Sequence, residues 1–125
     1  MKPKIILIGG GGHCRSVIDV IELENRFEIM GIVDKNEFIG KRVLGYEIIA
    51  SDDDLETLFE RCQNAVITVG QIKSNQVRVA LFYKLKKIGF NLPTIISPLA
   101  YLSKHASVDQ GTVIMHHALV NANAK

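Results

Sequence analysis

The 125-residue sequence has no tryptophan, and it has only two cysteines and three prolines. Cys14 and Cys62 lie far apart and lack metal-ligand spacing, so neither a disulfide scaffold nor a zinc knuckle is supported, and no metal site is predicted. The apolar run Ile5 to Ile8 is too short for a signal sequence or a membrane span. These features predict a protein of the reducing cytoplasm with no membrane span.

The sequence also lacks a strong charge of either sign. Fifteen lysines and arginines face thirteen aspartates and glutamates, giving a net charge of +2. This excess is too small and too evenly spread to predict binding to nucleic acid or to an anionic membrane. With 47% hydrophobic and 22% charged residues, the chain has the composition of a globular protein. Its length suits about one domain and excludes two full domains.

Between Lys4 and about Ile96, short apolar runs alternate with amphipathic stretches, a pattern typical of βαβ units around a parallel sheet. The first run is apolar at every position, as expected for a strand covered on both faces. The pattern predicts an α/β fold in which residues 1–97 form a small Rossmann-like, parallel-sheet domain. The expected strands are Ile5–Ile8, Phe27–Val33, Val66–Val69 and Asn91–Ile96, with a small β-excursion at Lys41–Ile49. The expected helices are His13–Glu24, Ser51–Arg61 and a third from near Ser74 that is capped at Gly89.

After Pro98 the period changes to six. Branched aliphatic residues recur every sixth position, and small residues recur four places after each of them. The aliphatic positions are Leu102, Val108, Ile114 and Val120, and the small ones are Ala106, Thr112, Ala118 and Ala124. This period predicts that residues 98–125 begin a left-handed hexapeptide β-helix, with an ordinary strand pair as the alternative. Because one such coil cannot bury a core by itself, we expect the chain to be the front of a longer protein.

Four consecutive glycines, Gly9 to Gly12, separate the first predicted strand from the first predicted helix. Bare backbone at a helix N-terminus can approach a phosphate closely, so Gly10, Gly11 and Gly12 are candidate binding residues. Gly9 and Gly11 match the first two glycines of the dinucleotide fingerprint, but Cys14 stands at the third position. The alternative, a turn that needs positive φ, explains one or two glycines but not four.

Asp34 ends the second predicted strand, where an acidic side chain binds a ribose hydroxyl in such folds. Lys35 follows it directly, and Gly70 and Gln71 follow the third predicted strand at the same edge of the sheet. These four residues are predicted to contact the ligand, although each could also be an ordinary loop residue. Only four predicted strands precede the six-residue repeats, or hexads. This small number of strands favours a mononucleotide-type ligand such as a nucleotide-linked sugar.

The histidines divide into one candidate ligand contact and three structural residues. His13 stands in the first turn of the first predicted helix, within reach of the glycine loop, so we predict contact with the ligand or, alternatively, a packing role. His116 and His117 point to opposite faces of an extended coil and have no carboxylate or cysteine at ligand spacing. They and His105 are predicted to be coil-corner residues. Both cysteines are predicted to be small buried hydrophobes.

A nucleotide-type head that opens with Gly-Gly-Gly-Gly-His, followed by hexapeptide coils, resembles the sugar O-acyltransferase family of the sialic acid O-acetyltransferase and bacillosamine N-acetyltransferase type. The resemblance covers the whole chain and rests on Ile8–His13, Gly31–Asp34, Ile67–Gly70 and Val113–Lys125. It implies that the head binds a nucleotide-sugar or amino-sugar acceptor. It also implies that the β-helix forms homotrimers whose interfaces hold acetyl-CoA.

The same resemblance implies an acetyltransferase that moves an acetyl group from acetyl-CoA to an amine or hydroxyl of the sugar. A histidine on the β-helix would act as general base in a coil beyond Lys125, so no catalytic residue is assigned here and these 125 residues alone are predicted to be inactive. Two alternatives stay open. One is an NAD(P)-type oxidoreductase domain, favoured by the glycines and Asp34 and opposed by Cys14 and the few strands. The other is a non-enzymatic nucleotide-binding module.

Overall fold

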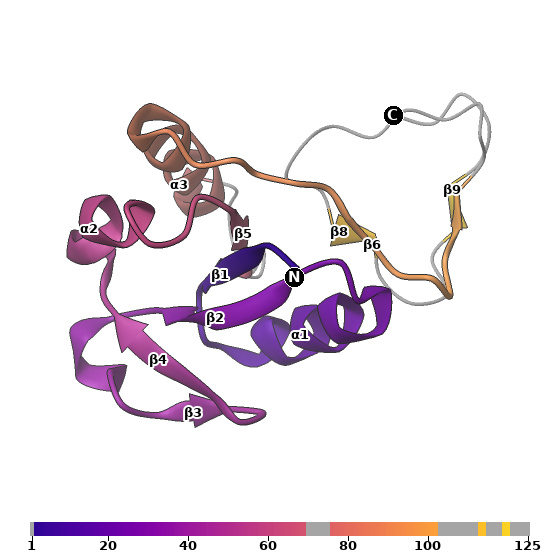
Figure 1. The fold of residues 1–125 in the computed structure, drawn as a ribbon, viewed down its shortest axis with the longest axis horizontal. Helices are drawn as coiled ribbons and strands as arrows, with labels where there is room; N and C mark the ends of the chain where they lie inside the picture. Colours follow the sequence, from indigo (N-terminus) through magenta and orange to yellow (C-terminus); the bar gives the residue numbers. More distant parts are fainter. Residues whose placement is uncertain (1, 70–75, 103–112, 115–118, 121–125) are drawn as a thin grey trace.

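The structure, a computed structural model, describes residues 2–69, 76–102, 113–114 and 119–120 (Figure 1). Nine strands, three α-helices and two 3-10 helices lie within these residues. The strands are β1 Lys4–Ile8, β2 Glu28–Val33, β3 Arg42–Val43, β4 Tyr46–Ala50, β5 Ala65–Ile67, β6 Ile95–Ile96, β7 Tyr101–Leu102, β8 Val113–Ile114 and β9 Leu119–Val120. The helices are α1 Gly12–Glu24, α2 Leu55–Phe59 and α3 Gln76–Ile88, and the 3-10 helices are η1 Asn36–Phe38 and η2 Asp52–Asp54.

Five strands form the main sheet in the order β3-β4-β2-β1-β5. Strands β4, β2, β1 and β5 are parallel, and β3 pairs with β4 as an antiparallel hairpin at one edge. The predicted parallel, Rossmann-like sheet is therefore confirmed, with α1 on one face and α2 and α3 on the other (Figure 1).

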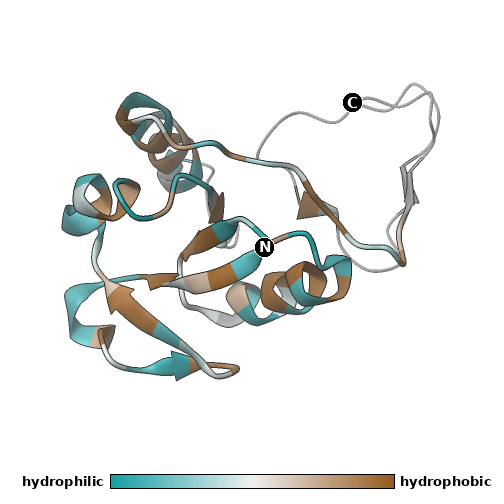
Figure 2. Ribbon diagram, in the orientation of Figure 1, coloured by the Kyte–Doolittle hydropathy of each residue, from teal (hydrophilic) through white to brown (hydrophobic). Residues whose placement is uncertain are grey.

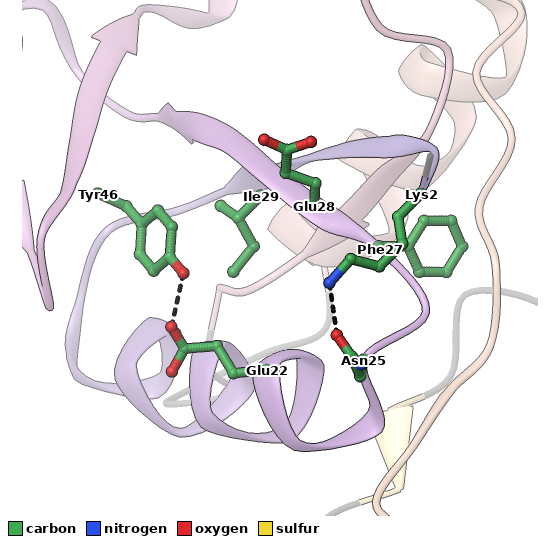
Figure 3. Close-up of a pocket in the computed structure, with 7 residues that line it drawn as sticks. All are labelled: Lys2, Glu22, Asn25, Phe27, Glu28, Ile29 and Tyr46. Atoms are coloured by element: carbon green, nitrogen blue, oxygen red, sulfur yellow. Dashed lines mark hydrogen bonds between the residues drawn. The ribbon is translucent and has the colours of Figure 1, made fainter.

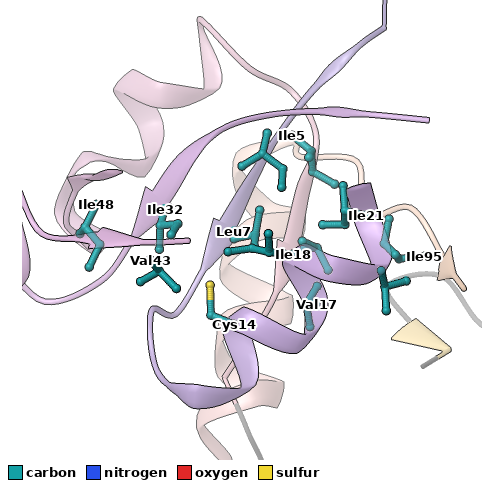
Figure 4. Close-up of a cluster of buried hydrophobic side chains, with 13 residues drawn as sticks. Ile5, Leu7, Cys14, Val17, Ile18, Ile21, Ile32, Val43, Ile48 and Ile95 are labelled. Atoms are coloured by element: carbon teal, nitrogen blue, oxygen red, sulfur yellow. The ribbon is translucent and has the colours of Figure 1, made fainter. Parts of the chain in front are cut away.

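Strand β1 is buried on both faces, as its continuous apolar run predicts. Ile5 and Leu7 point to the α1 face and pack with Val17, Ile18 and Ile21 of that helix (Figure 4). On the other face, Ile6 and Ile8 pack with side chains of α2 and α3, including Leu58 and Leu85. Apolar segments of β1 and α1, which share one cluster of buried side chains, lie next to each other in the ribbon (Figure 2). Because successive strand residues alternate between faces, one strand serves two cores.

The predicted β-excursion at Lys41–Ile49 contributes two strands, β3 and β4, to the main sheet. Strand β4 joins the main sheet parallel to β2, through the pairs Ile32 with Ile48 and Val33 with Ala50. The short helix predicted after it is present as η2 followed by α2. Its first turn is closed by Asp54, whose carboxylate accepts hydrogen bonds from the backbone amide and hydroxyl of Ser51.

The predicted fourth strand, Asn91–Ile96, is wrong as a strand of the main sheet. Asn91 forms only an isolated bridge to Asn64, while Ile95–Ile96 leaves the sheet and pairs in parallel with Val113–Ile114. Pro93 lies between them and has no amide hydrogen with which to continue a ladder. The predicted cap at Gly89 is confirmed, since Gly89 has φ +118° and directly follows α3.

Strands β6 to β9, called the tail from here on, pair at one constant separation. Ile95 pairs with Val113, and Tyr101 with Leu119, so each pair joins residues 18 positions apart, the length of three hexads. None of these strands belongs to the main sheet. The described residues contain no complete hexapeptide coil, and Ala106, Val108, Thr112, Ala118 and Ala124 lie outside them. The 1–97 and 98–125 division therefore stays a prediction.

Candidate nucleotide-binding site

A cavity of about 640 Å³ lies at the carboxyl ends of β1, β2 and β5, where open parallel sheets bind their ligands. It brings together five of the predicted site residues, namely Gly10, Gly11, His13, Asp34 and Lys35. The rest of its wall is formed by Ile8, Gly9, Val33, Phe38, Asp52, Thr68, Val69 and Leu81. A volume of this size falls in the range of pockets that enclose small organic ligands.

Asp34 connects the two loops that border the cavity. Its Oδ2 accepts a hydrogen bond from the Gly10 amide at 2.9 Å, and its Oδ1 accepts one from the Lys35 amide at 2.8 Å. The Asp34 amide itself donates to the carbonyl of Ala50 at 3.1 Å. Each carboxylate oxygen accepts one backbone hydrogen and retains a lone pair for a further donor. The side chain is therefore both a structural link and a hydrogen-bond acceptor in the wall of the cavity.

The glycines of the loop have different physical roles. Gly9 has φ +121°, and a Cβ there would lie 2.9 Å from Val69 Cγ2. At Gly10 a Cβ would lie 2.8 Å from Asp34 Oδ2, so a side chain would displace the carboxylate. At Gly11 a Cβ would meet nothing within 4 Å. Only Gly9 of the three needs positive φ, so a turn alone does not explain the run of glycines.

The N-terminus of α1 forms part of the cavity wall through Gly11 and His13. Gly11 is the N-cap, no side chain caps the helix, and its first turn contains no acidic residue. Helix geometry leaves the first amides without an i−4 acceptor, although the Cys14 amide donates to the Gly11 carbonyl at 3.0 Å, and the helix dipole places partial positive charge at this end. Gly12 is the first residue of the helix. This end of the cavity therefore suits an anionic group.

Cys14 and Thr68 form the floor beneath the loop. Both are buried, and the Thr68 hydroxyl donates to the carbonyl of Gly9. Burial raises the pKa of the Cys14 thiol to about 11, with the charge of Asp34 adding to the rise and a hydrogen bond with Thr68 opposing it. Burial also raises the pKa of Cys62. Both cysteines are free and buried, which confirms their prediction as buried hydrophobes.

Sequence reasoning missed Phe38, Asp52, Thr68 and Leu81 as cavity residues. Thr68 had a usable signal, because it lies at the carboxyl end of a predicted strand next to the predicted Gly70. Leu81 and Asp52 had none, since they reach the cavity only through the packing of α3 and η2. Gly70, Gln71, His105, His116 and His117 lie outside the described residues, so their predictions stay untested.

A second cavity of about 390 Å³ lies at the opposite, amino-terminal edge of the sheet (Figure 3). Four of its polar side chains are paired, since the Tyr46 hydroxyl donates to Glu22 at 2.5 Å and Lys2 donates to Asn25, and the fifth is the carboxylate of Glu28. The hydrogen bond to Glu22 raises the pKa of Tyr46 to about 12. These pairings leave the first cavity as the better candidate for an anionic ligand.

The described ranges contain no group of three or more histidine, cysteine, aspartate or glutamate side chains arranged to hold a metal ion. None of the helices in these ranges is long and apolar enough to cross a membrane.

Residues 4–85 match the family described as the PglD N-terminal domain. The chain belongs to this family. The predicted resemblance to sugar acyltransferases is thereby confirmed for the greater part of the chain. No curated protein sequence matches this chain.

Solved structures similar to this chain include PerB from Caulobacter crescentus in complex with CoA and GDP-perosamine, at 28% identity and a TM-score of 0.85. They also include the acetyltransferase domain of PglB from Neisseria gonorrhoeae FA1090 in complex with acetyl coenzyme A, at 29% identity and a TM-score of 0.85. The matches cover 96% and 98% of this chain but only 55% and 57% of those structures. The chain thus spans little more than half the length of these acetyltransferases.

A third structure, UDP-D-quinovosamine 4-dehydrogenase from Vibrio fischeri, is similar at 16% identity with a TM-score of 0.63, covering 73% of this chain and 75% of that one. Identity this low shows a shared fold alone.

Proposed function

We propose that this chain is the acceptor-binding part of an acetyltransferase that moves an acetyl group from acetyl-CoA to an amino group of a nucleotide-linked sugar. The observation that carries the proposal is the cavity in which the glycine loop, the N-terminus of α1 and Asp34 meet. Family membership and the similarity to acetyltransferase structures that hold CoA with GDP-perosamine, or acetyl coenzyme A, support it.

Each predicted residue has a role set by its chemistry. The amides of Gly11 and Gly12 and the positive end of α1 would bind the diphosphate, and Gly10, whose own amide donates to Asp34, would let the diphosphate approach the backbone closely. Asp34 would accept a hydrogen bond from a ribose hydroxyl or base amine with the lone pairs that its backbone contacts leave free. Lys35 and His13 supply hydrogen-bond donors in the same wall. Gly70 and Gln71, next to the described Thr68 and Val69, remain candidate contacts for the sugar or base.

In the transfer, the amine of the bound sugar attacks the thioester carbonyl carbon. A carbon–nitrogen bond forms as the amine loses a proton, the carbon–sulfur bond breaks, and CoA takes up a proton and leaves as a thiol. We assign the described residues to holding and orienting the acceptor, a contribution that makes the reaction effectively intramolecular. The general base and the acetyl-CoA site are assigned to the hexapeptide β-helix, as the resemblance implies, so residues 1–125 alone are proposed to be inactive.

The constant separation of 18 residues between paired tail strands supports a hexapeptide β-helix that begins near residue 98. We propose that the full-length protein is a homotrimer assembled through that β-helix. The two free, buried cysteines are consistent with the reducing cytoplasm as its location. The glycines and Asp34, which also favour the oxidoreductase alternative, fit a nucleotide sugar equally, and the dehydrogenase similarity extends to the fold alone.

The proposal predicts that nucleotide sugars stabilise the chain and that Asp34→Asn weakens this effect. A ligand at 100 times its Kd should stabilise the native state by about 2.7 kcal/mol. Thermal unfolding would be measured with GDP-, UDP- and CDP-linked amino sugars and with NADH. We expect at least one nucleotide sugar to raise Tm by several degrees and NADH to leave it unchanged.

Asp34→Asn replaces one acceptor oxygen by an NH2 group that would face a backbone N–H, so we expect it to lower affinity at least tenfold, which corresponds to about 1.4 kcal/mol. Asp53→Asn, at an exposed position outside the cavity, is the matched control and should bind like the wild type. Stabilisation by NADH but by no nucleotide sugar would contradict the proposal. Equal affinity of Asp34→Asn and the wild type would contradict the assignment of Asp34.

A further inference from the structure

Helix α1 connects the cavity to the tail. Gly11 and His13, at its N-terminus, line the cavity. Near its other end, Ile21 packs beside Ile95 of β6, a side chain with no solvent exposure (Figure 4). The helix has 13 residues, which corresponds to about 20 Å. One rigid element therefore reaches from the ligand cavity to the first strand of the tail.

Glu24, the last residue of α1, and Arg26, which follows the helix, hold the backbone on either side of Ile95. Glu24 Oε2 accepts a hydrogen bond from the Ile96 amide at 3.3 Å and one from Arg26 Nη1 at 3.0 Å. Arg26 Nη1 also lies 3.4 Å from the carbonyl oxygen of Thr94, to which it donates. The strand is thus fixed by an apolar contact and by polar contacts on both sides of it.

This contact is unlike an ordinary surface ion pair. The Glu24 side chain is only 11% exposed, and its second oxygen, Oε1, is buried without a hydrogen-bond partner among the described residues. Burial of an unpaired carboxylate oxygen opposes folding. Stability alone therefore does not explain a glutamate at this position. Its carboxylate supplies a hydrogen-bond acceptor for the β6 backbone.

Strand β6 is also the strand with which β8, further along the tail, pairs. Ile95 and Ile96 pair with Val113 and Ile114, three hexads further along the chain. Any rotation of α1 against β6 would carry the cavity away from the tail strands. In a reaction between a group held by the head and a group held by the tail, a displacement of about 1 Å can cost a factor of about 100 in rate.

We propose that Glu24 is a positioning residue, which sets the orientation of the nucleotide-sugar cavity relative to the tail through the β6 backbone. This inference rests on the proposed function, since it assigns the acceptor to the head and the acyl donor to the tail. Glu24 touches neither substrate in this scheme and acts through α1 and β6.

The kinetic test uses the full-length protein. Glu24→Leu keeps the size of the side chain but removes the acceptor, whereas Glu24→Gln keeps one oxygen that can accept from the Ile96 amide. Glu56→Leu, at an exposed position of α2, is the matched control. We expect Glu24→Leu to lower kcat at least tenfold at saturating substrates, with nucleotide-sugar affinity in calorimetry changed less than twofold. Glu24→Gln should retain kcat within threefold. An unchanged kcat in Glu24→Leu, or a parallel loss of affinity, would overturn the inference.

A distance measurement gives a second readout that does not depend on acetyl transfer. Spin labels at Thr57→Cys and Leu99→Cys, both exposed, would report the distance between head and tail by electron paramagnetic resonance, because the native cysteines are buried. We expect a narrow distribution in the otherwise unmodified protein, a broad one with Glu24→Leu, and recovery with Glu24→Gln. Should Glu24→Leu fail to fold, Arg26→Met replaces it and should broaden the distribution in the same way. An unbroadened distribution would overturn the positioning role, whereas absence of acetyl transfer in the wild type would instead refute the proposed function.

Discussion

At the scale of single residues, the cavity depends on how close the backbone of the glycine loop lies to Asp34 and Val69. Gly9 and Gly10 are required by this packing, because a Cβ at either position would come within 3.0 Å of a neighbouring atom. Gly11 is not required in this way, since the space around it is open. The open space at Gly11 lies in the wall of the cavity, where the proposed phosphate binding needs close approach to the backbone.

Gly11→Ala should therefore separate binding from stability. The φ of −75° at Gly11 is accessible to alanine, so we expect a change in unfolding free energy of less than about 1 kcal/mol, mainly from the weaker N-cap. The added methyl group would occupy the approach to the helix amides, and nucleotide-sugar affinity should fall at least tenfold. Chemical denaturation and calorimetry measure the two effects. Gly10→Ala is the comparison and should lose stability as well, and unchanged affinity in Gly11→Ala would refute the phosphate assignment.

Cys14 predicts a dependence of stability on pH. Its pKa in the folded protein, about 11, exceeds the ordinary thiol value of 9.0, so its contribution to stability is complete below pH 9 and is lost as the pH rises towards 11. Urea denaturation at several pH values should show a steeper loss of stability across this window for the wild type than for Cys14→Ala. Parallel curves would contradict the burial of the thiol as the cause.

At the scale of elements, the sheet depends on one close contact between neighbouring strands. Gly31 of β2 is buried, and Ile49 of β4 lies over it. A Cβ at position 31 would lie 2.7 Å from Ile49 Cδ1, 2.9 Å from Cγ1 and 3.0 Å from Cγ2. Because three atoms of the same side chain would clash, a change of rotamer at the tip of Ile49 would not relieve the contact.

Gly31→Ala should destabilise the protein by about 1 to 3 kcal/mol, the usual cost of overpacking a core. Combining it with Ile49→Ala should recover part of the loss, because the second change removes the three clashing atoms. A double-mutant cycle by denaturant unfolding measures this coupling. Additive effects of the two substitutions would show that the clash is not the cause.

At the scale of the whole molecule, Ile95 joins the tail to the core of the sheet domain. It belongs to the apolar cluster between the sheet and α1, and the partly buried Val113 packs against the same cluster. Its neighbour Ile96 is only half-buried. The two adjacent isoleucines thus form a matched pair for measuring how much the packing of β6 on the sheet domain contributes to the free energy of unfolding.

Ile95→Ala should lower the unfolding free energy by about 2 to 5 kcal/mol, because it removes a fully buried side chain from a packed cluster. Ile96→Ala should cost clearly less. Thermal or denaturant unfolding of the two variants makes the comparison directly. A larger loss of unfolding free energy in Ile96→Ala than in Ile95→Ala would contradict the packing of β6 against α1 through Ile95.

Much of the candidate site could be predicted because its signals are local. The glycines follow a buried strand, and Asp34 ends the next one, so their places at the sheet edge follow from the chain itself. The strand at Asn91–Ile96 was placed wrongly because apolar periodicity does not identify the pairing partner. Pro93 ends the ladder, and Ile95 then finds its contacts on α1 and β8.

The sequence by itself determined the parallel α/β character, the glycine loop, the position of Asp34 and the six-residue period of the tail, because periodicity and turn chemistry depend on neighbours along the chain. Only the tertiary structure decided that Asp34 accepts from Gly10, 24 residues away, that Thr68 supports Gly9, and that Glu24 holds β6. Such contacts depend on how layers pack, and close packing selects partners that no local pattern specifies.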